Sequence, residues 1–215
     1  MLNKKTRYLQ VALNSNLNEA LGIIQQLPRS ERILIEAGTP LIKGYGATAI
    51  SYLKQVWQGY VVADLKTMDR GETEVQIAAG AGASGAIALG IAPIETINSF
   101  ISSCTEFGLD SMLDMMNVDQ PIKILRRLKK LPNVVILHRG VDEENFNKDK
   151  PVPYVQINKI RSSYNVLVSV AGGDTIREVQ RAVFNDADIV VVWKEFYQQS
   201  SQTKSLVEQF LKAIK

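Results

Sequence analysis

Two hydrophobic patterns alternate along the chain. Short apolar runs rich in Val, Ile and Leu predict strands, and apolar residues at helical spacing between those runs predict helices. The predicted strands are 8–13, 32–36, 60–64, 85–89, 111–115, 134–137, 166–170 and 189–192. The predicted helices are 17–27, 45–57, 72–81, 94–107, 121–131, 155–163, 176–184 and 205–214. The polar stretch 142–153, which contains two prolines, predicts a loop.

This order gives eight strand–helix units in sequence. The connections are short, and the strands are apolar on both faces, as parallel strands covered by helices are. The pattern favours a single (β/α)8 TIM barrel of parallel strands, one domain over residues 1–215, rather than an open doubly wound sheet.

Composition and charge exclude several kinds of protein. The 25 basic and 22 acidic residues give a net charge of +3, which indicates neither nucleic acid nor a membrane surface as a partner. The densest basic cluster, residues 126–130, lies on a predicted helix and is interpreted as its solvated face. A single cysteine, Cys104, excludes an internal disulfide and a multi-thiolate metal site. We expect a cytoplasmic location, because the N-terminal residues show neither a signal peptide nor a spanning helix.

Two glycine-rich segments resemble nucleotide or phosphate loops. Residues 80–85 match a dinucleotide fingerprint, but they follow a helix and precede a strand, the reverse of the order that binds a pyrophosphate. Gly172 and Gly173 follow a strand and open a helix, the arrangement in which backbone amides hold a phosphate. The alternative for the second segment is a plain loop with Asp174 or Thr175 as the helix cap.

Polar residues recur where the predicted strands end. Active sites of these barrels lie at the C-terminal ends of the strands, so these side chains are predicted to converge. They are Asn14, Glu36, Asp64, Lys66, Gly90, Asp114, Asn117, His138, Arg139, Gly172, Gly173, Trp193 and Lys194. His138 is the only histidine of the chain, and its position favours a catalytic role over a structural one.

The segment 64–69 places three charges at the end of an apolar strand. Strand alternation makes Asp64 and Lys66 point the same way, and paired opposite charges keep each other ionised. Asp69 adds a second carboxylate. The alternative interpretation is a structural ion pair at a strand end.

The same run, Asp64-Leu65-Lys66-Thr67-Met68-Asp69, resembles the Asp-x-Lys-x-x-Asp signature of the orotidine 5'-monophosphate decarboxylase superfamily. Further similar segments occur in order at 9–13, 35–40, 114–118, 138–142 and 171–173. Together they most resemble the 3-hexulose-6-phosphate synthase family. The related 3-keto-L-gulonate-6-phosphate decarboxylases have an arginine where this chain has Val141, which favours the synthase side.

The resemblance implies an aldol reaction in which ribulose 5-phosphate forms an enediolate that attacks formaldehyde. Glu36 and Asp64 would bind Mg2+, with Mn2+ as an alternative. Lys66 would stabilise the developing oxyanion, and His138 would transfer the proton. The resemblance also implies a homodimer in which Asp69, counted among the catalytic residues with Asp64, completes the partner's site. The implied substrate contacts are Asn14, Glu36, Asn117, Arg139, Gly172, Gly173 and Lys194.

Two positions depart from the family pattern. Asn14 stands where relatives have an aspartate, and Trp193-Lys194 stands where they have a glycine followed by arginine or glycine. The first bears on catalysis and the second on phosphate binding. The alternatives are therefore a non-catalytic sugar-phosphate-binding relative, or a decarboxylase or isomerase of the same barrel family.

Overall fold

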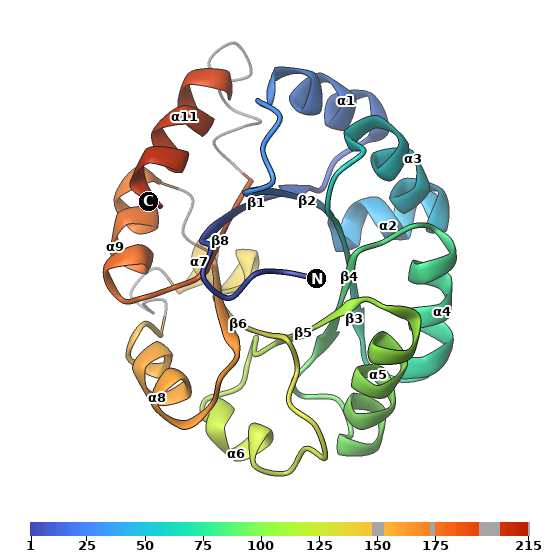
Figure 1. Ribbon diagram of the computed structural model, residues 1–215, viewed down its shortest axis with the longest axis vertical. Coiled ribbons are helices and arrows are strands. Elements are labelled where there is room, and N and C mark those ends of the chain that lie inside the picture. The colour runs from blue at the N-terminus through green and yellow to red at the C-terminus, as the bar shows by residue number, and fades with distance from the viewer. Residues whose placement is uncertain (148–152, 173–174, 194–202, 215) are drawn as a thin grey trace.

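A computed structural model describes residues 1–147, 153–172, 175–193 and 203–214. Eight parallel strands form a closed barrel in chain order, and helices surround it (Figure 1). The strands are β1 Tyr8–Leu13, β2 Ile33–Ala37, β3 Val61–Thr67, β4 Gly85–Leu89, β5 Asp110–Asp114, β6 Val134–His138, β7 Leu167–Ala171 and β8 Ile189–Val192. The predicted TIM barrel is confirmed.

Helices alternate with the strands and carry apolar stripes toward them. They are α1 Leu17–Gln26, α2 Thr39–Tyr45, α3 Ala47–Trp57, α4 Gly71–Gly80, α5 Ile94–Phe107, α6 Pro121–Leu125, α7 Val141–Phe146, α8 Val155–Ser163, α9 Ile176–Phe184 and α11 Thr203–Ala213. Several ends follow local rules: Asn16 caps α1 by accepting from the amide of Glu19, and Gly108 ends α5 at φ 73°. Among the described helices, none is long and apolar enough to cross a bilayer.

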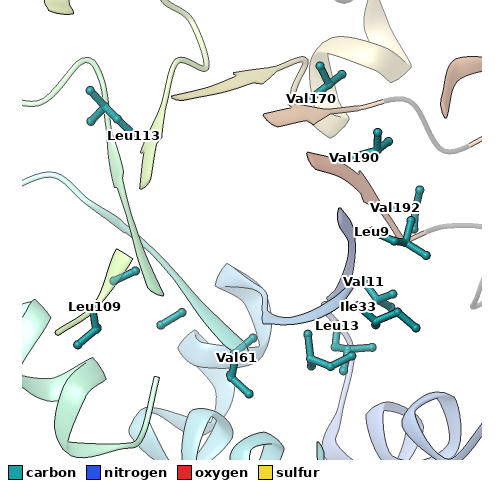
Figure 2. Packing of buried hydrophobic residues seen from close by; sticks show 14 of the residues in the cluster. Leu9, Val11, Leu13, Ile33, Val61, Leu109, Leu113, Val170, Val190 and Val192 are labelled. Atoms are coloured by element: carbon teal, nitrogen blue, oxygen red, sulfur yellow. The ribbon is translucent and has the colours of Figure 1, made fainter. Parts of the chain in front are cut away.

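The strands bury both faces. Alternate residues such as Leu9, Val11 and Leu13 pack in the cluster that also includes buried helix residues, and Figure 2 shows them beside Ile33 and Val192. The intervening residues point into the barrel, where an inner cluster includes Tyr8, Leu34, Val62, Met112 and Ile136. The period of two in a strand therefore divides each run between an outer and an inner core.

Three predicted boundaries are wrong. A helix, α7, occupies residues 142–146 of the predicted loop 142–153; acidic residues 142–144 in its first turn complement the N-terminal end of the helix dipole. A separate helix, α2, precedes α3 and has a proline in its first turn. Helix α6 ends at Leu125 and not at 131. The polar residues of α7 and the proline and glycines around α2 made these short helices hard to predict, and the apolar spacing after Leu125 predicted too long a helix for α6.

Strand β3 is irregular where its charged residues lie. It continues to Thr67, so Lys66 lies inside the strand and not after it. Its pairing with β4 shifts register between Ala63 and Thr67, and Lys66 has φ 47°, in the left-handed region. Lys66 and Asp64 do meet, as predicted, but a bulge and not regular alternation brings them together.

Candidate active site

A cavity of about 730 Å³ opens at the C-terminal ends of the strands. It brings together most of the residues predicted from the strand ends. Those that line it are Asn14, Glu36, Asp64, Lys66, Asp114, Asn117, His138, Arg139, Gly172 and Trp193. Gly173 and Lys194 lie outside the described residues. Asp69 is exposed in the turn between β3 and α4 and does not line the cavity, and neither does Gly90.

Asp114, at the end of β5, is the centre of a hydrogen-bonded network. Its Oδ2 accepts from Lys66 Nζ at 2.9 Å and contacts His138 Nδ1 at 2.7 Å, while its Oδ1 accepts from the amide of Met116 at 2.9 Å. Burial alone would raise its pKa, but the charges and hydrogen bonds of His138 and Lys66 hold that pKa well below its usual range. Asp114 is therefore a fixed negative charge between the ammonium of Lys66 and the imidazole of His138.

His138 is oriented by this carboxylate. Because an ionised carboxylate only accepts, Nδ1 carries the hydrogen and Nε2 is the nitrogen that can exchange a proton with a ligand. Burial lowers the pKa of the imidazole, but Asp114 outweighs burial and raises it above its ordinary value. The pair is arranged as a proton-transfer dyad with a strengthened base.

Lys66 is held as a cation. Its Nζ lies 2.9 Å from Asp114 Oδ2 and 3.1 Å from Asp64 Oδ2. Burial lowers the pKa of the ammonium, yet the two carboxylates raise it above the ordinary value. A permanently protonated amine cannot attack a carbonyl to form an imine, so the environment of Lys66 suits electrostatic stabilisation and not covalent catalysis.

Glu36 and Asp64 form a second acidic group on neighbouring strands. Burial, and then repulsion from Asp64, raises the pKa of Glu36 to about 7. Gln10 donates its side-chain amide to Glu36, and Thr39 donates its hydroxyl to Asp64 Oδ2 at 2.8 Å. Two buried carboxylates on neighbouring strands, one of which raises the pKa of the other, are suited to bind a cation.

The donor set fits Mg2+ or Mn2+. The described residues contain no group of three or more His, Cys, Asp or Glu side chains arranged around a metal position. Mg2+ is commonly held by one or two carboxylates, with water and substrate oxygens in its other positions. Glu36 and Asp64 could supply those two oxygen ligands, and no sulfur or imidazole ligand would be needed.

The charge balance of the cavity also favours a bound divalent cation. Six described carboxylates line it, three inside and three on α7, against Lys66, Arg139 and His138. The three on α7 are Asp142, Glu143 and Glu144. An anionic ligand therefore meets an excess of negative charge, which a bound divalent cation would offset.

Two departures from the family pattern have a structural answer. Lys66 retains two carboxylate partners although residue 14 is asparagine, so its charge remains balanced. Trp193 packs against the inner cluster and lines the cavity, but the cavity keeps its volume of about 730 Å³. The tryptophan therefore lines the cavity without filling it.

Three site residues were not assigned a role from the sequence. Asp114 was recognised only as a polar strand end, and Gln10 and Thr39 were not recognised as partners of the acidic pair. Arg139 was named as a substrate contact; its guanidinium donates to the carbonyl of Gly172 at 3.0 Å and lies 3.3 Å from Glu144. Arg139 therefore links the segments that follow β6 and β7.

The model of the orotidine 5'-phosphate decarboxylase / HUMPS family matches residues 7–208. The chain belongs to this family. A bifunctional enzyme Fae/Hps of Archaeoglobus fulgidus is 42% identical over 190 residues, which are 86% of this chain and 47% of that protein. The chain spans about half the length of the curated relatives it matches.

Two solved structures share the whole barrel. A crystal structure of 3-hexulose-6-phosphate synthase has a TM-score of 0.86 and 27% identity, and the match covers 97% of this chain and 100% of that one. A 3-keto-L-gulonate-6-phosphate decarboxylase of Vibrio cholerae has a TM-score of 0.80 and 21% identity, covering 97% of each chain. The second likeness is one of fold alone.

Proposed function

We propose that the protein is an aldehyde-lyase of the 3-hexulose-6-phosphate synthase kind, joining formaldehyde to D-ribulose 5-phosphate. The observation that carries the proposal is the combination, in one cavity, of the Lys66–Asp114–His138 network with the Glu36–Asp64 pair. The sequence identity of 42% to a bifunctional enzyme Fae/Hps and of 27% to a 3-hexulose-6-phosphate synthase supports the same reaction. Mg2+, or Mn2+, is the proposed cofactor.

The reaction begins with proton transfer. His138 Nε2 takes a proton from C1 of ribulose 5-phosphate, and the electron pair of that C–H bond becomes the double bond of an enediolate. Glu36 and Asp64 would hold a metal ion, which would polarise the ketone and stabilise negative charge on oxygen. Lys66 places an ammonium beside the same charge, and Asp114 keeps both Lys66 and His138 in position.

The second half forms the carbon–carbon bond. C1 of the enediolate attacks the carbon of formaldehyde, and the carbonyl π pair moves to the formaldehyde oxygen. That oxygen takes up a proton, for which protonated His138 is the proposed donor, so the base is regenerated. Asn14 and Asn117 line the cavity and are proposed to hydrogen-bond the sugar hydroxyls.

The phosphate is proposed to bind at the loop after β7. Gly172 has φ 95°, and a Cβ there would lie 2.4 Å from the carbonyl oxygen of Arg139, so only glycine fits. Gly173 and Lys194 are proposed to add an amide and a counter-charge. Arg139 contributes a further positive charge at this side of the cavity.

The assembly is proposed to be a homodimer in the cytoplasm. Asp69 is exposed beside the cavity-lining strand β3, where it is free of the protomer's own site and available to a neighbour's. Met68, next to it, is 46% exposed, as an apolar residue at a subunit contact would be before assembly. The single cysteine agrees with a reducing compartment.

The deciding experiment measures formaldehyde consumption with ribulose 5-phosphate, with Mg2+ and then with excess chelator. Turnover that requires the metal is expected, and Asp64→Asn should remove it while the protein stays folded. Activity unaffected by chelator would contradict the metal mechanism. Release of CO2 from 3-keto-L-gulonate 6-phosphate without formaldehyde consumption would identify a decarboxylase, and ribulose 5-phosphate binding without turnover would identify a non-catalytic relative.

A further inference from the structure

Gln10 is a buried amide directly beneath the acidic pair. It lies on β1 with 1% of its surface exposed, and its side chain lines the floor of the cavity. In the β1–β2 register Gln10 is paired with Leu34, and Ala12 with Glu36. Gln10 is therefore one inward-facing step deeper in the barrel than Glu36, close enough for a diagonal contact.

The orientation of the amide is determined by its partner. Nε2 donates to Glu36 Oε2, and this orientation suits the ionised form of Glu36, the form that binds a cation, because an ionised carboxylate offers only acceptors. The other end, Oε1, is buried without a hydrogen-bond partner among the described residues. Gln10 thus makes one hydrogen bond to a residue of the proposed metal site and leaves its carbonyl unsatisfied.

This arrangement is a poor solution for stability alone. A buried carbonyl oxygen without a partner opposes folding, and a methionine of similar shape would fill the same space without that cost. The neighbouring inward positions, including Val62 and Met112, are apolar. What glutamine supplies and an apolar side chain cannot is the N–H that fixes one oxygen of Glu36.

We infer that Gln10 is a positioning residue that fixes Glu36 Oε2 from below, so that Oε1 is presented to a divalent cation. The inference rests on the proposed function, because it assumes that Glu36 is a metal ligand. Partners that orient a ligand in this way typically change metal affinity or activity by about 10- to 100-fold when they are removed. Gln10 acts through Glu36 and touches neither the substrate nor the reacting atoms.

The test compares Gln10→Met with Ser169→Ala. Ser169 is a matched control, since it lies on β7 with 1% exposure and a buried hydroxyl that has no partner among the described residues. Mn2+ binding to each folded, substrate-free protein is measured by calorimetry, and the Mn2+ concentration that gives half-maximal rate is measured separately. Gln10→Met is expected to lower the affinity for Mn2+, and to raise the Mn2+ concentration that gives half-maximal rate, by about 10- to 100-fold. For Ser169→Ala both quantities should stay within about twofold of wild type.

A second measurement covers the case in which Gln10→Met does not fold. The side-chain amide of Gln10 in the wild type should give NMR signals that exchange slowly with solvent. These signals should shift when the metal-free protein is titrated with Mg2+, which is diamagnetic and is used here in place of Mn2+. Unchanged Mn2+ affinity in folded Gln10→Met, equal weakening in Ser169→Ala, or amide signals insensitive to Mg2+ would overturn the positioning role. A wild type that binds no divalent cation would overturn the proposed metal site as well.

Discussion

The substitution Glu36→Gln tests the electrostatics of the acidic pair directly. It removes the negative charge while retaining an oxygen that can accept from Gln10. Burial, followed by Asp64, raises the pKa of Glu36 from 4.5 to about 7 in the folded protein. Because the folded-state pKa is the higher one, folding favours the protonated carboxyl, and its contribution to stability is lost as the pH rises through about 7.

The magnitude follows from that change in pKa. A tenfold change in proton affinity corresponds to about 1.4 kcal/mol, so a rise from 4.5 to about 7 corresponds to about 3 kcal/mol at high pH. Roughly 2.5 kcal/mol of this should develop between pH 5 and pH 8. Without metal, Glu36→Gln should therefore gain about that much stability relative to wild type as the pH is raised over this interval.

The assay is urea unfolding in chelator at pH 5 and pH 8, followed by two probes whose coincidence establishes a two-state transition. Glu208→Gln is the control, because Glu208 is exposed on α11. Adding Mn2+ at pH 8 should stabilise wild type by mass action and Glu36→Gln much less. If the difference in free energy of unfolding between wild type and Glu36→Gln does not change with pH, the raised pKa of Glu36 is refuted.

Three further predictions concern the catalytic groups. Asp114 raises the pKa of His138; Asp114→Asn should move the acidic limb of the pH profile of kcat/KM to lower pH, because the base loses its proton more easily, and lower kcat by roughly 10- to 100-fold. Mixing inactive Asp69→Ala and His138→Ala subunits should restore about a quarter of wild-type activity, since half of randomly paired dimers carry one intact site; no recovery after proven subunit exchange would count against shared sites. Lys194→Ala should weaken ribulose 5-phosphate binding by about 1.5–3 kcal/mol in calorimetry and leave D-ribulose unaffected; equal effects on both ligands would exclude a phosphate contact.

Much of the fold follows from local pattern. The strands are apolar runs of a length that a barrel strand requires, and their C-terminal polar residues mark the rim, so His138 and Glu36 were placed correctly by position. Short helices were harder, because α7 is as polar as a loop and is stabilised by acidic residues at its first turn. The left-handed backbone at Lys66 could not be predicted, because the residue is not a glycine and its conformation accompanies the bulge in β3.

The role of Asp114 shows where local pattern stops being sufficient. Asp64 and Asp114 both end inward-facing series, on β3 and β5, and β4 lies between those strands in the sheet. Alternation within a strand predicts that each carboxylate points into the barrel, but not that the two lie at the same height. Height depends on the stagger of the closed barrel, which brings side chains from alternate strands into one layer. Only then does Lys66 reach both carboxylates and His138 share one of them, so the network is a property of closure and not of any single segment.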